Sequence, residues 1–202
     1  YQARELQYVL NQSRAAGLVL LPEFRGNPML GTATDVRPEC PDLREVVRLD
    51  EWDDFLASGD AFDGDLVDPD PMDPVMIQYT SGTTGFPKGA LLHHRGLVNN
   101  GAHTGDRVGV TEGAVYVLTM PLFHTGGCVL GVLTAVSMKM TMVLVEAFDP
   151  GLVLELIEAY DGAAMLGVPT MLVAMLEHPD FAIRDLSAIE AICSGGTPVP
   201  AA

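Results

Sequence analysis

Basic residues are scarce in this chain of 202 residues. Lys and Arg together number 11 against 27 Asp and Glu, which gives a formal net charge of −16 at pH 7. Proteins that bind nucleic acid or anionic membranes need a basic footprint, so this balance argues against both kinds of partner. Cysteine is scarce too: Cys40, Cys128 and Cys193 are too few and too scattered for a disulfide framework or a zinc site. Such usage indicates a reduced, cytoplasmic setting.

Long apolar runs are also missing. Between His124 and Lys139 lies a 14-residue stretch, 125–138, without Asp, Glu, Lys, Arg or His, and it contains three glycines. A membrane-spanning helix needs about 20 apolar residues, so this stretch predicts a buried core helix, and we expect neither a transmembrane segment nor a signal peptide. Hydrophobic residues make up 48% of the chain, which excludes disorder as the general state. Because the chain starts at Tyr1 and stops just after a Gly/Pro-rich turn, we expect a piece of a longer protein.

Negative charge is concentrated in one segment. Residues 50–73 hold ten Asp or Glu and neither Lys nor Arg, so they account for −10 of the net −16. Such a block repels itself and prefers solvent, which favours an acidic surface linker. A calcium site or an interaction tail is the alternative, although the acidic spacing differs from that of an EF-hand loop. Trp52 and Phe55 predict a short helix that packs against the body of the fold.

Short apolar runs alternate with helix-like runs along most of the chain. The predicted strands are 17–21, 75–79, 90–92, 114–120, 141–145, 163–167 and 189–193. The predicted helices are a first one that ends before Gly17, then 96–107, 126–138, one that starts at Asp149-Pro150 and ends by Gly162, and 169–176. Residues 22–43 are rich in Pro and Gly and predict a loop. This alternation predicts an α/β fold with layered, largely parallel sheets flanked by helices.

The sharpest local pattern is the run from Tyr79 to Gly89, which reads Y-T-S-G-T-T-G-F-P-K-G and follows an apolar strand. Its three glycines let a ligand approach the main chain, and successive backbone N–H groups in such a turn form an anion-binding nest. Four hydroxyl side chains and Lys88 add donors and one positive charge, which suits a polyphosphate. It is not a Walker A loop, because Pro87 precedes the lysine and Gly89 follows it. A Ser/Thr/Gly-rich hairpin connection without a ligand is the alternative.

This run resembles the signature of the adenylate-forming enzymes, which comprise acyl-CoA synthetases, beetle luciferases and the adenylation domains of peptide synthetases. Further segments resemble the family in its order, namely 92–99, 121–124, 167–170 and 194–200. The resemblance covers essentially the whole chain and is closest to fatty-acid or medium- and long-chain acyl-CoA ligases. It implies part of the large N-terminal domain, with 1–49 as the end of a first α/β subdomain, 50–74 as the acidic linker and 75–202 as a truncated nucleotide-binding subdomain.

In this family a carboxylate attacks the α-phosphorus of ATP to give acyl-AMP and pyrophosphate, and the acyl group then passes to a thiol, usually that of coenzyme A. The resemblance therefore implies ATP, Mg²⁺ and coenzyme A as cofactors and a small carboxylic acid as substrate. It also implies that Lys88 assists the catalysis electrostatically and that Thr80 contacts Mg²⁺. The β- and γ-phosphates would lie against Thr80, Ser81, Gly82, Thr83, Thr84 and Gly85.

The same resemblance implies a catalytic role for His124, between the carboxylate and the α-phosphate. Taken alone, a single histidine after Pro-Leu-Phe would be a packed core residue, and the other four histidines are assigned no catalytic role. The adenine would lie against Gly195, Gly196, Thr197 and Pro198. Four residues either line an acyl pocket or belong to the core, namely Phe123, Gly126, Gly127 and Met165.

The segment around His124 also bears on the substrate. Family members that activate amino acids place an aspartate near this motif, whereas residues 121–125 contain no acid, which favours an amine-free carboxylic acid. The Mg²⁺-binding Thr-Glu motif should follow the adenine segment; Thr111-Glu112 precedes it and predicts only a helix-to-strand loop. The distal motifs and the C-terminal domain with its catalytic lysine are absent. We therefore expect part of an AMP-forming acid–thiol ligase that does not complete adenylation alone.

Two alternative functions and the oligomeric state remain open. The first is an adenylating enzyme whose acyl acceptor is a carrier protein or oxygen, since neither the glycine-rich run nor His124 distinguishes the acceptors. The second is a non-catalytic nucleotide-binding or interaction module in which the acidic block recruits a partner. A homodimer is the third open question, because the sequence does not define the oligomeric state.

Overall fold

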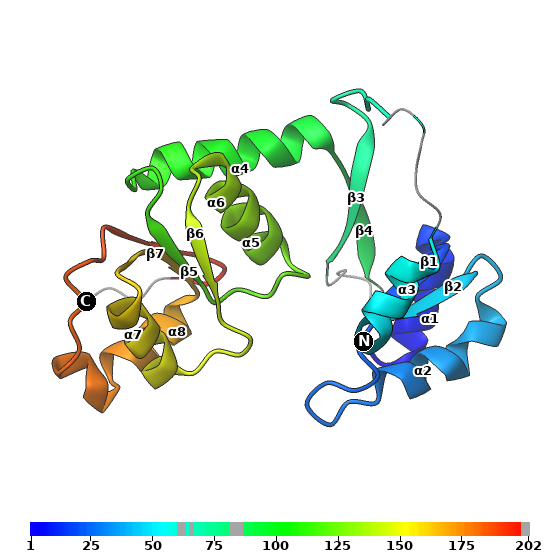
Figure 1. Cartoon of the computed structure of the whole chain (residues 1–202), viewed down its shortest axis with the longest axis horizontal. Coiled ribbons are helices and arrows are strands. Elements are labelled where there is room, and N and C mark those ends of the chain that lie inside the picture. The colour runs from blue at the N-terminus through cyan, green and yellow to red at the C-terminus, as the bar shows by residue number, and fades with distance from the viewer. Residues whose placement is uncertain (60–63, 65–66, 81–86, 199–202) are drawn as a thin grey trace. The chain divides into compact units, whose positions relative to one another are not determined.

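The computed structural model describes residues 1–59, 64, 67–80 and 87–198 (Figure 1). The chain forms two compact units, Tyr1–Pro69 with Met76–Leu91, and Asp70–Val75 with Leu92–Ala202. In each unit strands alternate with helices. The pairing of β1 with β2 and the three pairings of the larger sheet are all parallel, which confirms the predicted α/β class.

The first unit contains a small two-stranded parallel sheet with Gly17 opposite Glu45. Helix α1 packs on α2, and a cluster of Leu10, Val36, Cys40 and Leu43 forms the core. The elements in chain order are α1 (Ala3–Ser13), β1 (Gly17–Leu20), α2 (Met29–Val36), a 3-10 turn (Arg37–Glu39), β2 (Glu45–Arg48), a second 3-10 turn (Leu49–Glu51) and α3 (Trp52–Ala57).

Helix α2 corrects the prediction of a loop over residues 22–43. Prolines stop a helix only where they interrupt it, and here Pro28 sits at the N-cap while Pro38 follows the last helical turn. The eight residues between carry their buried positions, Ala33 and Val36, three apart. That spacing is helical, and Gly31 within it is a tolerated cost rather than a break.

The acidic segment begins with the predicted short helix, α3. The rings of Trp52 and Phe55 contact each other with centroids 5.4 Å apart. The two side chains remain 40% and 45% exposed, so they pack on one another more than on the body of the fold.

Strands β3 (Pro74–Thr80) and β4 (Lys88–His93) form a separate two-stranded sheet. Residues 81–86 connect them and lie outside the described residues, so Ser81, Gly82, Thr83, Thr84 and Gly85 have no structural account. The two strands confirm the apolar runs that were predicted on either side of the glycine-rich segment.

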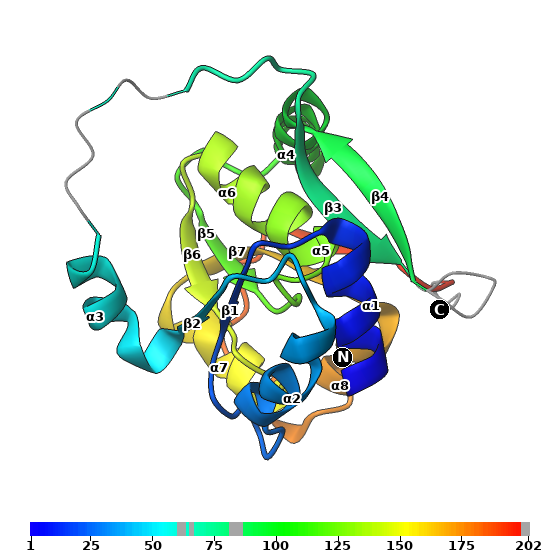
Figure 2. The same ribbon diagram turned by 90° about the vertical axis from the view of Figure 1, so that its right-hand side faces the viewer.

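The second unit contains a four-stranded parallel sheet in the order β6-β5-β7-β8. Figure 2 labels three of its strands, β5, β6 and β7. The connection from β5 to β6 runs to one side, and the chain then crosses back over β5 to reach β7 and β8. Its elements are α4 (His94–Val108), β5 (Val115–Leu118), α5 (Thr125–Gly127), a π-helical segment (Cys128–Leu133), α6 (Thr134–Ser137), β6 (Thr141–Leu144), α7 (Pro150–Ala159), β7 (Gly162–Gly167), α8 (Pro169–Leu176), a 3-10 turn (Pro179–Ala182) and β8 (Ala191–Ser194).

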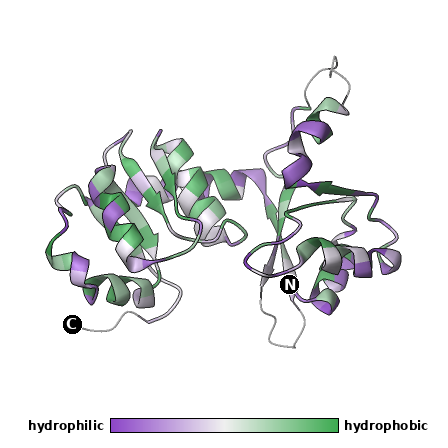
Figure 3. Ribbon diagram, turned by 60° about the horizontal axis from the view of Figure 1, so that its bottom comes forward, coloured by the Kyte–Doolittle hydropathy of each residue, from purple (hydrophilic) through white to green (hydrophobic). Residues whose placement is uncertain are grey.

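Side chains on successive strand positions build two cores on opposite faces of this sheet. Tyr116 packs with Ala135 and Val110, toward the layer that holds α4, α5 and α6. Val117, the next residue, packs with Val153 and Ile157 of the α7 and α8 layer. Figure 3 shows the corresponding hydrophobic strands and the mixed colouring of the helices around them. Burial on both faces is typical of parallel sheets and explains the uninterrupted apolar character of these strands.

Local signals at helix ends are confirmed. The carboxylate of Asp149 accepts a hydrogen bond of 2.8 Å from the backbone N–H of Leu152, and Pro150 follows at the first helical position. The loop that contains Thr111 and Glu112 joins α4 to β5, as predicted. Glu112 forms an ion pair of 2.5 Å with Lys139, which lowers the pKa of the Glu112 carboxyl.

The uncharged stretch 125–138 is the predicted buried helix, with a π-helical middle. It approaches α4 so closely that a Cβ on Gly101 would lie 2.7 Å from Cβ of Leu133. The buried hydroxyl of Thr134 donates to the Gly101 carbonyl at 3.1 Å. Among the described residues, no helix is both long enough and apolar enough to cross a membrane.

Candidate functional site

The candidate site is a cavity of about 480 Å³ at the carboxyl ends of β5, β7 and β8. The strand order reverses between β5 and β7, and helices leave these strands on opposite sides of the sheet. Ligands of open α/β sheets bind at such a switch point, just beyond the strand ends. The lining residues are Met120, Pro121, Phe123, His124, Thr125, Gly126, Leu130, Leu166, Gly167, Val168, Cys193, Ser194, Gly195 and Gly196.

The lining is apolar apart from a few uncharged polar groups. Among the described residues, the lining contains no Asp, Glu, Lys or Arg, and its polar side chains are those of His124, Thr125, Cys193 and Ser194. The described residues hold no group of three or more His, Cys, Asp or Glu that could bind a metal ion. A charged group would therefore meet only dipoles and one imidazole here, so the cavity suits the uncharged parts of a ligand.

His124 stands at the turn that leads from β5 into the helical stretch. Its Nδ1 accepts a hydrogen bond of 2.9 Å from the backbone N–H of Gly126, which makes it the N-cap of α5. The backbone N–H of His124 donates to the Pro121 carbonyl at 3.1 Å. A Cβ on Gly127 would overlap this same carbonyl group, so the turn requires glycine there. His124 is exposed and lines the cavity, so the structure places it at the cavity wall and not in the core.

The glycines after β8 form a second part of the wall. Gly196 has φ of +89°, a conformation that favours glycine. A Cβ on Gly195 would meet no atom within 4 Å, so its backbone borders open space that a flat ligand could fill. Thr197 and Pro198 follow in the chain but are not part of the lining.

Buried hydroxyls support the cavity from beneath. The Tyr116 hydroxyl donates to the Leu130 carbonyl at 3.2 Å, and burial raises the pKa of Tyr116 to about 12. The Thr119 hydroxyl donates to the Leu166 carbonyl at 2.8 Å and so ties β5 to β7. The carbonyl of Leu130 belongs to the π-helical segment, a geometry that is frequent at functional sites.

The four residues with two open interpretations divide between cavity and core. Phe123 is 85% exposed and lines the cavity, as does Gly126. Met165 is only 2% exposed and packs under α7, so it belongs to the core, and Gly127 is buried in the turn. Met165 is the only one of these four on a strand, β7, and the face that it occupies is not shown by any local pattern.

Thr80 and Lys88 lie in the first unit, at the ends of β3 and β4 that residues 81–86 join. The Thr80 hydroxyl is 3.5 Å from the Lys88 carbonyl oxygen, and both residues are exposed. The structure therefore brings these two predicted residues together. His124, Gly195 and Gly196 form the other set, in the second unit.

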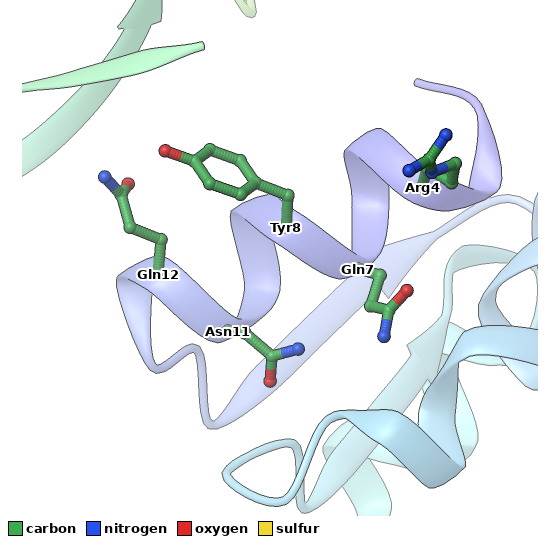
Figure 4. Close-up of a pocket in the computed structure, with 5 residues that line it drawn as sticks. All are labelled: Arg4, Gln7, Tyr8, Asn11 and Gln12. Atoms are coloured by element: carbon green, nitrogen blue, oxygen red, sulfur yellow. The ribbon is translucent and has the colours of Figure 1, made fainter. Parts of the chain in front are cut away.

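A second hollow, also about 480 Å³, lies along α1 (Figure 4). Its lining residues come from this helix, and two of them hold it in place. Asn11 donates to the Glu39 carbonyl at 2.9 Å, and Gln12 Oε1 accepts from the Tyr79 hydroxyl at 2.6 Å. Gln12 thereby anchors the strand that enters the glycine-rich run. Sequence reasoning missed this contact because the partners are 67 positions apart and Gln12 belongs to no recognisable pattern.

Known proteins resemble the whole chain. A putative acyl-CoA synthetase, YngI of Bacillus subtilis (strain 168), is 35% identical over 226 residues, which cover 99% of this chain and 41% of that protein. The mitochondrial medium-chain acyl-CoA ligase ACSF2 of Homo sapiens is 32% identical over 231 residues, with 99% and 38% covered. The chain thus spans about two fifths of the length of these relatives.

Solved structures share the fold. The inhibitor-bound N-terminal domain of FACL13 from Mycobacterium tuberculosis has a TM-score of 0.86 at 24% identity, with 99% of this chain and 49% of that chain covered. ATP-bound MatB from Rhodopseudomonas palustris has a TM-score of 0.79 at 26% identity, with 98% and 39% covered. The family model described as "AMP-binding enzyme" matches residues 1–202. The chain belongs to the AMP-binding enzyme family.

Proposed function

We propose that this chain is the nucleotide- and acid-binding part of an ATP-dependent acyl-CoA synthetase. The observation that carries the proposal is the cavity at the switch point, where His124 and the Gly195-Gly196 backbone meet in a chain of the AMP-binding family. The named relatives are acyl-CoA synthetases or ligases, and one solved relative contains ATP. These likenesses support the proposal for a chain that covers only part of each relative.

The proposed reaction has two steps. A carboxylate oxygen attacks the α-phosphorus of ATP, the bond to the β-phosphate oxygen breaks, and pyrophosphate leaves. The sulfur of coenzyme A then attacks the acyl carbon, the bond to AMP breaks, and the thiol proton passes to solvent. Both steps crowd negative charge, so the chain must position its substrates and supply hydrogen-bond donors.

The described residues offer places for the base and for the phosphates of an adenylate. The open space beside Gly195 is a cradle that a Cβ would fill, and a flat base fits there. Thr197 and Pro198 would border the base from outside the lining. We assign to His124 contact with the reacting oxygens, and to Lys88 charge stabilisation of the leaving phosphates. Thr80 offers one hydroxyl to Mg²⁺, which would neutralise phosphate charge when bound, and the glycine-rich run with Ser81 and Gly82 would hold those phosphates.

The cavity lining supports an amine-free acid as substrate. An ammonium group needs a carboxylate partner, and the part of the lining that the structure describes has none. The apolar walls favour an aliphatic or aromatic tail. A cytoplasmic location, a homodimer, and the division into residues 1–49, 50–74 and 75–202 remain predictions. The name of one relative places that protein in mitochondria.

The test combines binding and turnover. We expect the chain to bind an acyl-sulfamoyl adenosine, a stable analogue of acyl-AMP, in isothermal titration calorimetry. We expect no ATP–pyrophosphate exchange by the chain alone. The longer protein that contains it should exchange with octanoate and not with 2-aminooctanoate, which carries an ammonium group. Absence of analogue binding would contradict the proposal. Transfer of the acyl group to a carrier protein and not to coenzyme A would contradict the proposed acceptor.

A further inference from the structure

The side chain of Gln12, on α1, lies against both ends of the run 79–89. Its Oε1 accepts a hydrogen bond of 2.6 Å from the hydroxyl of Tyr79, the first residue of the run. A Cβ built on Gly89, the last residue of the run, would lie 3.3 Å from the same oxygen. All three residues belong to the first unit. One oxygen of a helix thus meets the run where it starts on β3 and where it ends on β4.

This close approach explains the glycine at position 89. A Cβ there would lie 2.8 Å from Cγ2 of Ile77 and 3.4 Å from Cε1 of Tyr79. Ile77 and Tyr79 are two positions apart on β3, so their side chains share one face of the strand. Any larger residue at position 89 would push these side chains away from β4, and with them the hydroxyl that Gln12 holds.

The residues held in this way are the direct neighbours of Thr80 and Lys88. Thr80 follows Tyr79, and Lys88 precedes Gly89. The proposed function gives these two exposed residues the contacts with Mg²⁺ and with the leaving phosphates. A small displacement of a group that positions a substrate can cost a large factor in activity. The contacts of Tyr79 and Gly89 with Gln12 therefore bear on the phosphates although Gln12 belongs to another element.

We propose that Gln12 is a positioning residue for the triphosphate of the nucleotide. It holds Tyr79 beside Gly89 and so fixes Thr80 and Lys88 for the β- and γ-phosphates, without itself contacting the ligand. This inference rests on the proposed function, because it takes Thr80 and Lys88 as the residues that bind metal and phosphate.

The Gln12 bond is suited to orienting Tyr79 more than to stabilising the unit. Gln12 is exposed, so water replaces a lost partner and the net contribution of the bond to stability is small. The Tyr79 hydroxyl also lies 3.4 Å from the carbonyl oxygen of Val9, which stays in place when Gln12 is replaced. We therefore expect removal of the Gln12 amide to displace Tyr79 without unfolding the first unit.

Asn11 supplies a matched control on the same helix. Its side chain also makes one exposed hydrogen bond, to the carbonyl of Glu39 at 2.9 Å, and so ties α1 to a turn of the first unit. Figure 4 shows the Asn11 and Gln12 side chains on different sides of the helix. The two residues thus share a structural role, and only Gln12 contacts the run.

The test measures the affinity of the full 202-residue chain for Mg·ATP and for AMP by isothermal titration calorimetry. In Gln12→Leu we expect affinity for Mg·ATP to fall roughly three- to tenfold and affinity for AMP, which lacks the β- and γ-phosphates, to stay unchanged. Asn11→Leu should lower the urea midpoint as much as Gln12→Leu does and change neither affinity. Unchanged Mg·ATP affinity in Gln12→Leu, or an equal loss for AMP, would overturn the inference.

A double-mutant cycle tests whether Gln12 acts through Tyr79. Tyr79→Phe removes the hydroxyl and should weaken Mg·ATP binding by a similar factor. The double variant should bind no more weakly than either single variant, because both remove the same bond. Additive losses would overturn the inference. Failure of the wild-type chain to bind Mg·ATP, or unchanged affinity in Lys88→Ala, would instead overturn the proposed function, and the positioning role with it.

Discussion

The glycine-rich run at 79–89 and the cavity of the second unit differ in how they are assembled. The run is continuous in sequence, and its ends belong to two strands that are adjacent in one two-stranded sheet. The cavity collects segments near residues 120, 167 and 195, which parallel pairing of β5, β7 and β8 brings together. Removing an exposed side chain of the run should therefore change ligand binding alone. Changes at the cavity should also lower stability, except at a wall residue that packs against no other part of the unit.

Gly127 and Gly195 give the sharpest test of that difference. In Gly127→Ala the new Cβ overlaps the Pro121 carbonyl group, so we expect a loss of about 3 kcal/mol or more in the free energy of unfolding. In Gly195→Ala the Cβ enters open space, so stability should stay within about 0.5 kcal/mol of wild type while affinity for the adenylate analogue falls. Urea unfolding and calorimetry separate the two effects. Equal destabilisation by both variants would refute the assignment of Gly195 to the wall.

The two lysines of the chain test the run. Lys88→Ala removes a charge at the end of β4, and we expect ATP affinity to fall roughly tenfold to hundredfold without loss of stability, because the residue is exposed. The loss should shrink at high salt. Lys139→Ala removes an exposed charge that pairs with Glu112 and should leave ATP affinity unchanged. Fluorescence titration with a labelled ATP analogue measures both, and a similar effect of the two variants would point to net charge in place of a specific contact.

Thr119 tests the tie between β5 and β7 beneath the cavity. Thr119→Val keeps the shape but leaves the Leu166 carbonyl without its partner, so we expect a loss of about 1–3 kcal/mol in the free energy of unfolding. Thr119→Ser retains the hydroxyl and should recover most of that loss. The measurement is urea unfolding, and it sharpens the comparison because Lys88→Ala in the run should leave stability unchanged.

Tyr116 gives the smallest effect, seen as a pH dependence. Burial raises the pKa of Tyr116 to about 12, from 10.0, so the folded chain holds this proton more tightly than the unfolded chain. Its contribution to stability is complete below pH 10 and is lost as the pH rises toward 12. A spectrophotometric titration at 295 nm should show Tyr116 ionising late, and burial also raises the pKa of Tyr79. Tyr116→Phe should remove that step and cost about 1 kcal/mol; an unchanged titration would contradict the assignment.

Much of the fold follows from local patterns, and the exceptions have physical causes. Asp149-Pro150 predicts a helix start because a cap needs only neighbouring residues. The strands of the second unit are recognisable because burial on both faces makes them continuously apolar. Helix α2 was missed because prolines near both of its ends resemble loop chemistry. The fate of Met165, core and not cavity, depends on which face of β7 it occupies, and a fully apolar strand carries no alternation to show that.

The sequence by itself determined the α/β class, the family resemblance and the identity of the residues worth testing, because capping, turn chemistry and motif spacing act over a few neighbouring positions. The tertiary structure alone decided which of those residues meet. Parallel pairing of β5, β7 and β8 brought His124 and Gly195 into the lining of one cavity. Pairing between distant strands depends on the whole packed unit, and for that reason no local pattern contains it.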